Sequence, residues 1–292
     1  MTYARRTIDL VFNLGSQTGG ADQITLTGLK VAADIQLTGG PSYGTASIRA
    51  FGVPLSVINQ LTTLGQLYPD IRQNTVTVIA GDERNGKAAV FTGQISEAYA
   101  SFDGAPDTMF TVNAYPALLD ALRPLAPTST ATATDAATIM SGLASQMNYL
   151  FENNGVKATL PPSYFPGTGR QQAEAIARAG NFDLVFDDQA LDGKTLVILP
   201  RNGVRGGGVV PRIAADTGMV GYPAYVQNAM IVTSLYNPNV RFNGEIEVQS
   251  SIPAASGRFK VYELSHSLSS ETNGGPWFTR MQCITYGREA PK

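Results

Sequence analysis

Two runs of sequence determine the predicted fold: Met109-Phe110-Thr111-Val112-Asn113-Ala114-Tyr115 and Trp277-Phe278-Thr279-Arg280-Met281-Gln282-Cys283-Ile284-Thr285-Tyr286. Each run alternates polar and apolar residues, which is typical of a half-buried β-strand. Each also follows a loop that contains Gly and Pro. Because β-rich segments end in the same way twice, we predict two copies of one β-barrel, joined by a connector.

The first barrel is expected in residues 1–118, as strands with one inserted helix. Pro54 suits the first turn of that helix, and Gly65 can end it. One face of the helix would carry Val57, Ile58, Leu61 and Leu64. The expected strands are 8–12, 23–27, 34–37, 45–49, 75–80, 89–92 with 94–96, and 109–113.

The connector, residues 119–208, is expected to be a small α+β module that closes with Pro200 and a flexible Gly206-Gly207-Gly208. Its first helix is expected because Ile139, Leu143, Met147 and Leu150 recur at helical spacing. The expected elements are a linker over 124–134, a helix capped by Thr134 or Asp135 that ends near Asn154-Gly155, a helix from the capping box at Thr168 to Gly180, and strands 182–186 and 195–199 paired across Asp192-Gly193.

The second barrel is expected in residues 209–292, where strands return. The expected strands are 228–235, 245–248, 259–264 and 278–286. The predicted fold class is therefore mainly β with a smaller α+β part, as two barrels joined by an α+β module.

The composition excludes several classes of protein. Of the 292 residues 15% are charged, against about 25% in a typical soluble protein. The net charge of −2 argues against sequence-independent nucleic-acid binding. No segment is apolar enough for a membrane span or a secretory signal, and the single Cys283 cannot form an intrachain disulfide. A polar surface with little charge suggests burial against partners.

A hydrolase motif occurs once, at Gly40-Pro41-Ser42-Tyr43-Gly44, which matches G-x-S-x-G. That motif requires a strand before it and a helix after it, whereas here alternating segments flank a hairpin loop on both sides. His266, the sole histidine, is the only possible histidine base for Ser42. We therefore predict a turn at Ser42 and an ordinary hydrogen-bonding role for His266.

Phosphate and metal motifs are incomplete. Gly193-Lys194-Thr195 ends like a phosphate-binding loop, but the required earlier glycine would fall at Asp188. The glycine-rich 203–208 precedes Pro211 rather than a helix, which favours a linker. Asp183, Asp187, Asp188 and Asp192 form an acidic cluster that could chelate a hard cation, but its spacing favours a solvated hairpin turn.

The remaining search for chemistry finds no catalytic, cofactor or metal residue. Cys283 has no neighbour that would lower the pKa of its thiol. Nothing selects a pair of carboxylates for glycoside hydrolysis, although such a pair stays open. The aromatic residues follow a period of two and are not interleaved with lysines. A structural or binding role without a cofactor is therefore expected rather than an enzyme.

The C-terminal third carries an ordered set of short motifs. They are Thr217-Gly218-Met219-Val220-Gly221-Tyr222-Pro223, then Asn237-Pro238 through Gly244 to Val248, Gly257-Arg258-Phe259-Lys260-Val261, His266 and Trp277-Phe278-Thr279. With the Ala-rich helix at 173–177, this order resembles the baseplate hub proteins of tailed bacteriophages, contractile ones in particular. It is also similar to the hub portion of type VI secretion spikes.

The resemblance implies a homotrimer in which each chain has two tail-tube-like barrels, so that the ring is pseudo-sixfold. One side would meet a hexameric tail tube or tube-initiator protein, the other a trimeric central spike, with wedge proteins around it. DNA would pass the channel only as cargo. The protein would be made in the host cytoplasm and reside in the virion, and no spike or lysozyme-like domain is expected within 1–292.

Two alternatives stay open. A receptor- or carbohydrate-binding tail module would need exposed aromatic residues gathered in one cleft. A cell-wall hydrolase would act through Ser42 or through a carboxylate pair. No interface residue can be assigned from strand alternation alone, because alternation does not tell which face meets a partner.

Overall fold

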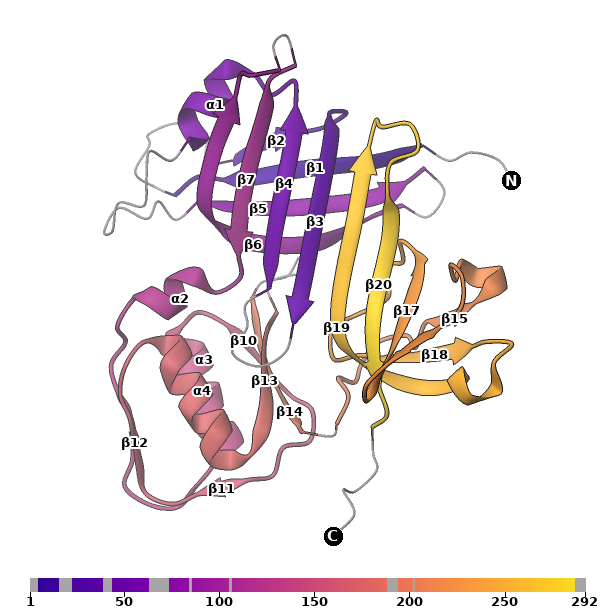
Figure 1. Cartoon of the computed structure of the whole chain (residues 1–292). Helices are drawn as coiled ribbons and strands as arrows, with labels where there is room; N and C mark the ends of the chain where they lie inside the picture. Colours follow the sequence, from indigo (N-terminus) through magenta and orange to yellow (C-terminus); the bar gives the residue numbers. More distant parts are fainter. Residues whose placement is uncertain are drawn as a thin grey trace. The chain divides into compact units, whose positions relative to one another are not determined.

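In the computed structural model most strands belong to one large, mainly antiparallel sheet, and helices are few (Figure 1). The structure describes residues 5–15, 23–38, 44–62, 74–83, 86–104, 107–187, 194–201 and 203–286. The chain divides into unit 1, which comprises Met1–Leu37, Gly44–Leu118 and Ser265–Thr279, and unit 2, which comprises Thr38–Tyr43, Leu119–Leu264 and Arg280–Lys292. The prediction of a mainly β fold is confirmed.

Unit 1 consists of two layers of strands that cross one another (Figure 1). The long strand β6 belongs to both layers, because its first half pairs with β5 and its second half pairs with β7. A register shift between Ile95 and Glu97 marks the bend. The bounds are β1 Arg6–Asn13, β2 Gln23–Leu26, β3 Lys30–Thr38, β4 Thr45–Phe51, α1 Leu55–Leu61, β5 Thr75–Asp82, β6 Gly86–Ser101 and β7 Met109–Tyr115.

The core of unit 1 draws on strands of both layers. Phe12, Phe91 and Phe110, from β1, β6 and β7, are among the largest fully buried side chains. Gly93 lies at the bend of β6, where an added Cβ would come within 2.6 Å of the Phe91 ring. A side chain at this position would therefore displace the aromatic core.

Unit 2 contains further strands of the large sheet and an α+β part. The strands are β15 Arg212–Ala214, β16 Ala224–Val226, β17 Ala229–Leu235, β18 Glu245–Gln249, β19 Gly257–Ser270 and β20 Trp277–Ile284. The last two continue into unit 1 with Ser265–Ser270 and Trp277–Thr279. Two short 3₁₀ turns, Ala215–Thr217 and Pro253–Ala255, lie between strands.

The α+β part packs two helices on one face of a three-stranded sheet of order β10-β14-β13 (Figure 1). Strand β14 is buried on both faces: Leu196 and Ile198 join the helix core, while Val197 and Leu199 pack with Phe242. The bounds are α2 Leu118–Leu122, β8 Thr128–Thr130, β9 Thr134–Asp135, α3 Ala136–Gln146, β10 Leu150–Asn153, β11 Thr159–Leu160, β12 Ser163–Phe165, α4 Gly169–Gly180, β13 Phe182–Asp187 and β14 Thr195–Pro200.

The second predicted helix of the connector is confirmed, and the first is too long. Thr168 caps α4 through the expected capping box with Gln171, and α4 ends at Gly180. Asp135 caps α3 by accepting a hydrogen bond from Thr138 N, but α3 ends at Gln146. Asn148 adopts a left-handed backbone with φ of 59°, which breaks the helix, so the residues from Leu150 onward form strand β10 instead.

The expected linker over 124–134 is held by hydrogen bonds and contains strand β8, which pairs with β12. Gln172, which is fully buried in α4, accepts from the backbone N and side-chain Oγ1 of Thr128 at 3.0 and 2.8 Å. Its amide also donates to the carbonyl oxygens of Leu125, Ala126 and Gly167. The prediction of a plain linker is therefore wrong, because one buried amide fixes its backbone.

The order of strands in the large sheet repeats. The order β16-β17-β20-β19 continues as β3-β4-β7-β6. We call β3–β7 the first set and β16–β20 the second set. In both sets the fourth strand is the longest, and its first half pairs with the strand that precedes it: β6 with β5, and β19 with β18. The two runs quoted at the outset are the closing strands, β7 and β20.

The expected strands of both β-rich segments are present, as are the pairings β3 with β4 and β13 with β14. Helix α1 follows Pro54, and it buries Ile58 and Leu61 as expected. The expected helix end at Gly65 lies outside the described residues. The division into 1–118, 119–208 and 209–292 stays a prediction.

Candidate functional site

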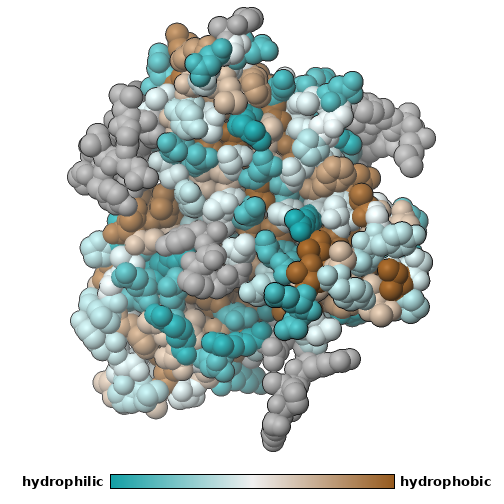
Figure 2. Space-filling model, viewed as in Figure 1, coloured by the Kyte–Doolittle hydropathy of each residue, from teal (hydrophilic) through white to brown (hydrophobic). Residues whose placement is uncertain are grey.

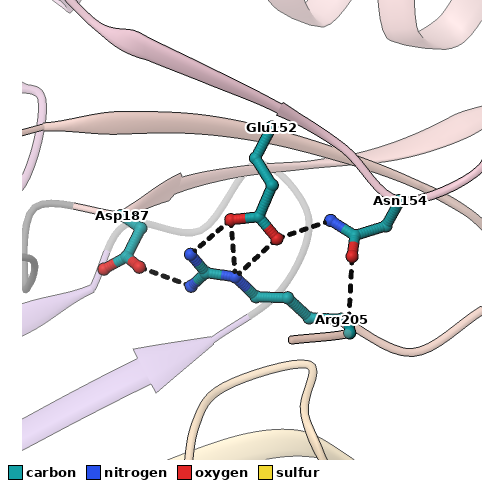
Figure 3. A network of polar contacts seen from close by, with 5 residues as sticks. Glu152, Asn154, Asp187 and Arg205 are labelled. Carbon is teal, nitrogen blue, oxygen red and sulfur yellow. Dashed lines mark hydrogen bonds and ion pairs between the residues drawn. The ribbon is translucent and has the colours of Figure 1, made fainter. Parts of the chain in front are cut away.

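Charged and polar side chains of unit 2 converge on Arg205 (Figure 3). Its Nη2 lies 2.8 Å from Oε2 of Glu152, which is on β10, and its Nε donates to both oxygens of the same carboxylate at 3.2 and 3.3 Å. Its Nη1 bonds to Oδ2 of Asp187, the last residue of β13. Asn154 completes the network: it donates to Glu152 Oε1 and accepts from Gly206 N, both at 2.8 Å.

Burial and pairing set the charges of this network. The side chains of Arg205 and Asp187 are only 11% and 12% exposed. Burial acts to raise the pKa of Glu152, but hydrogen bonds from Arg205 and Asn154, with the charges of Arg205 and Arg241, outweigh burial and lower it. Burial acts to lower the pKa of Arg205, and its two acidic partners outweigh burial and raise it. Glu152 and Arg205 therefore both stay charged at neutral pH.

The same charged residues join the α+β part to the second set. The backbone N of Arg205 donates to Asn243 O at 2.8 Å, next to the isolated bridge between Arg205 and Gly244. Nearby, the buried Lys260 of β19 forms an ion pair at 3.3 Å with Asp183 of β13. The arrangement is that of a structural clamp, which we call the Arg205 clamp, rather than of a reaction centre.

His266 is buried in β19, where its Nδ1 lies 3.0 Å from Oγ1 of Thr279 in β20. Burial lowers the pKa of the imidazole to about 4, so the ring is neutral at pH 7. The hydrogen-bonding role predicted for His266 is confirmed. Its proposed partner in hydrolysis, Ser42, lies outside the described residues, as does most of the G-x-S-x-G segment.

Cys283 is buried in β20, and burial raises the pKa of its thiol to about 12. A thiol with such a pKa is not ionised at neutral pH and is therefore a poor nucleophile. Lys194 lies over the ring of Tyr149, with Nζ 5.5 Å from the ring centroid, and Thr195 is buried in β14. Neither points to a phosphate site, and Gly193 lies outside the described residues.

The acidic cluster is only partly described. Asp183 and Asp187 are paired with Lys260 and Arg205, whereas Asp188 and Asp192 lie outside the described residues. Over the described part of the chain, no group of three or more His, Cys, Asp or Glu side chains could hold a metal ion. The first glycine of the 206–208 linker, Gly206, is bonded to Asn154 through its backbone N.

Sequence reasoning missed the Arg205 clamp and the role of Lys260. Arg205 lies 53 residues from Glu152 and 18 from Asp187, so no local pattern connects them. The available signal was weak: an isolated arginine before three glycines, opposite an acidic hairpin.

A second candidate surface is an uncharged stretch around β16 and β17. Residues 217–240 contain no Asp, Glu, Lys, Arg or His. Large apolar side chains are nevertheless exposed there, with Tyr222 71% and Tyr225 60% exposed. The other members are Val220, Val226 and Leu235. Exposed apolar residues gathered in one segment favour an interaction surface.

Comparisons with known structures reveal the same fold in tail proteins. A tail protein from Neisseria meningitidis MC58 has a TM-score of 0.63 at 9% identity, with 96% of each chain covered. The 43 kDa tail protein of prophage MuSo2 from Shewanella oneidensis has a TM-score of 0.60 at 11% identity, with 95% of this chain and 96% of that chain covered.

A type VI secretion component has the fold as well. The E. coli c3393 protein, described as structurally similar to the T4 bacteriophage tail proteins gp27 and gp5, has a TM-score of 0.60 at 10% identity. The match covers 96% of this chain and 79% of that chain. No curated protein matches the sequence. None of the helices that the structure describes has the length and apolar character needed to cross a membrane.

A family comparison covers nearly the whole chain. The family described as Baseplate hub gp41 matches residues 8–283, a range that includes both sets of strands and the α+β part between them. The resemblance predicted from the ordered C-terminal motifs is thereby confirmed. The chain belongs to the Baseplate hub gp41 family, a family of structural proteins of the phage tail.

Proposed function

We propose that the chain is one subunit of a homotrimeric ring that adapts a hexameric tail tube to a trimeric central spike. Each chain would contribute two tube-like β-barrels, within 1–118 and 209–292, joined by the connector 119–208. Three chains would then present six similar units, which reconciles threefold with sixfold symmetry. The role is structural, without catalysis or a cofactor.

The repeated strand order carries this proposal. The first and second sets have the same order in the sheet and along the chain. A chain with two equivalent sets can offer the same kind of surface twice, which is what a sixfold partner requires of three subunits. The family match and the likeness to tail proteins support the proposal.

The surface chemistry also supports a subunit that is buried against partners. Only 15% of the residues are charged. Pale residues of intermediate hydropathy cover much of the face seen in Figure 2. A net charge of −2 suits a channel through which DNA passes without binding.

The spike is the partner best supported by the comparisons. A similar fold occurs in a structure described as a Francisella PdpA-VgrG complex, with a TM-score of 0.56 at 7% identity. That match covers all of this chain and 60% of that chain. The remaining partners in the proposal are the tail tube or tube initiator and the wedge proteins of the baseplate.

The test is the assembly state of the purified protein with and without its spike partner. Native mass spectrometry should give a mass of three chains, and electron microscopy should show rings with six similar lobes. A chain that stays monomeric in both conditions would contradict the proposal. Peptidoglycan clearing or hits on a glycan array would instead favour one of the alternative functions.

A further inference from the structure

Each set closes with a hairpin in which its longest strand is followed directly by its last strand. β6 is joined to β7 in the first set, and β19 is joined to β20 in the second. We call the described residues of the first connection, 102–104 and 107–108, the first tip, and residues 271–276 the second tip. The two tips therefore occupy equivalent places in the two sets.

Both tips are closed by the same kind of backbone hydrogen bond. In the first tip Asp107 N donates to Gly104 O at 2.9 Å, and in the second tip Gly275 N donates to Thr272 O at 3.3 Å. Each bond joins a residue to the one three positions before it, which is the pattern of a β-turn. The two tips therefore present similar backbone turns.

Side chains next to the tips hold both of them in place. Ser101 Oγ, at the end of β6, donates to Asp103 Oδ2 at 3.0 Å. A nitrogen of the Arg6 side chain donates to Gly275 O in the second tip at 3.2 Å. A turn that is already ordered loses little conformational entropy when it binds a partner, so both tips are suited to a stable contact.

Both tips lie at the same end of one layer of strands in unit 1 (Figure 1). One row of paired residues crosses the layer next to the first tip: Ser101, Met109, Phe51 and Lys30, from β6, β7, β4 and β3. Ser270, the last residue of β19, continues this row, because its Oγ accepts from Val31 N at 3.2 Å and donates to Leu29 O at 2.9 Å. The second tip follows Ser270 directly.

The order of strands in this layer also determines how far apart the tips are. Four strand spacings separate the centre of the β19–β20 hairpin from the centre of the β7–β6 hairpin, which amounts to about 19 Å. In a sixfold ring, equivalent points on neighbouring subunits are separated by the radius at which they lie. Two tips that contact equivalent points therefore lie at a radius of about 19 Å from the ring axis.

Elsewhere the two sets differ. Helix α1 follows β4 in the first set, whereas residues 236–244 follow β17 in the second. At the strand ends opposite the tips, β7 leads into α2 and the connector, whereas no described helix or strand follows β20. The tips differ in charge, since Asp103 and Asp107 belong to the first, and Glu271 of the second is paired with Arg5 at 2.7 Å. The likeness of the tips is therefore one of backbone shape.

We propose that the two tips are the contacts of this chain with the hexameric tail tube, and that each tip meets the same site on one of two neighbouring tube subunits. Three chains then supply six tips, one for each tube subunit. The threefold spike meets the opposite ends of the strands, where the two sets differ. This inference rests on the proposed function, which supplies the two partners and their symmetries.

The test is photo-cross-linking from the tips to the tail-tube protein encoded by the same genome. Asp103→Cys and Asn273→Cys place a thiol on an exposed residue of each tip, while the native Cys283 is buried. Each full-length chain, labelled with a benzophenone maleimide, should cross-link to the tube protein, and mass spectrometry should find both labels on the same tube peptide. Ser251→Cys, at an exposed residue between β18 and β19, is the matched control and should give no cross-link.

Two further measurements follow from the same contact. Asp103→Arg and Asn273→Arg should each weaken tube binding on the order of tenfold while the trimer is retained, and Ser251→Arg should leave tube binding unchanged. Electron microscopy of the complex between hub and tube should place the contacts at a radius of about 19 Å.

The outcomes separate this inference from the proposed function. A wild-type trimer that binds tube and spike, with no cross-link from either tip or with the two labels on different tube peptides, overturns the inference and leaves the proposed function. Labels that reach the spike instead of the tube also overturn the inference alone. A wild type that is monomeric with and without the spike, or a trimer that binds no tube protein, contradicts both.

Discussion

Strands β3 and β16 open the two sets in the same position but have opposite environments. β3 lies between β4 and β19, and alternate side chains of β3 are buried. β16 lies beside β17 alone among the described strands, and all of its residues are exposed. The difference shows that equivalent positions in a repeat need not have equivalent sequences: the alternating apolar residues of β3 are buried in the chain's own core, whereas all three residues of β16 are exposed.

The largest expected effect comes from placing a charge in β3. Ile35→Lys puts an ammonium group where the side chain is fully buried. We expect the free energy of unfolding to fall by about 4 kcal/mol or more, because a buried charge without a partner is among the most destabilising changes. Urea denaturation followed by circular dichroism measures it. If Ile35→Lys is as stable as the wild type, then β3 is as exposed to solvent as β16, and the two strands do not differ in their environments.

The Arg205 clamp joins the α+β part to the second set, so breaking it tests how much the stability of this region depends on the clamp. Arg205→Met leaves Glu152 and Asp187 without their shared cation. We expect a loss of about 3 kcal/mol in the free energy of unfolding. The loss should shrink as the pH falls below 4.5, the ordinary pKa of Glu152. The folded-state pKa of Glu152 is lowered, so its contribution is present above 4.5 and disappears through the folded value.

The matched control for the clamp is Arg212→Met. Arg212 pairs with Asp216, but these side chains are 45% and 65% exposed. An exposed pair contributes about 0 to 1 kcal/mol. Equal losses in the two variants would mean that the Arg205 clamp is no stronger than an ordinary surface ion pair.

A smaller effect should come from His266, which lies in the half of β19 that covers β3. Its pKa falls from 6.5 to about 4 in the folded protein. Between these values the unfolded chain binds the proton and the folded chain does not, so stability falls as the pH decreases from 6.5 to 4. The decrease should reach at most about 3.5 kcal/mol, at about 1.4 kcal/mol per pH unit.

Denaturation midpoints at pH 7, 5.5 and 4.5 measure this contribution of His266. The His266→Gln chain should be less stable at pH 7 but should depend less on pH across the same range. If the stability of the wild type and of His266→Gln changes equally with pH, groups other than His266 cause the pH dependence.

The smallest effect is expected in β16. Tyr225→Lys adds a charge to a side chain that is 60% exposed, so the stability of the single chain should change by no more than about 0.5 kcal/mol. Denaturation at a concentration where the wild type is monomeric measures it. A loss as large as that of Ile35→Lys would show that β16 is already covered within its own chain.

Local signals predicted the local elements well. Thr168 caps helix α4, Gln171 completes the capping box and Gly180 is the last residue of the helix, so these three residues together specified its start and end. The predicted end of the first connector helix was wrong because of Asn148. The helical spacing of apolar residues continues to Leu150, but the backbone is left-handed at Asn148, before that residue. The spacing of apolar residues does not show where a helix ends when the next strand begins with an apolar residue at the position that the helical period would predict.

The clamp and the edges could not be predicted from the sequence. Gln172 and Arg205 act on residues up to 53 positions away, and the packing of the strands decides which polar groups meet. The strand alternation of β3 was recognisable from the sequence, but its pairing with β19, more than 200 residues later, was not. Even so, the two similar closing strands, β7 and β20, indicated the repeat that orders the sheet.

The pairing of β3 with β19 has a consequence for the kinetics of assembly. In the proposed ring of six sets, three junctions would lie within single chains, where the effective concentration of one strand at the other does not depend on how much protein the cell has made. Only the three junctions between chains would need collisions between molecules. A ring of six separate subunits needs six such junctions. We therefore expect the trimeric hub to form at lower protein concentrations than a ring of six separate subunits would.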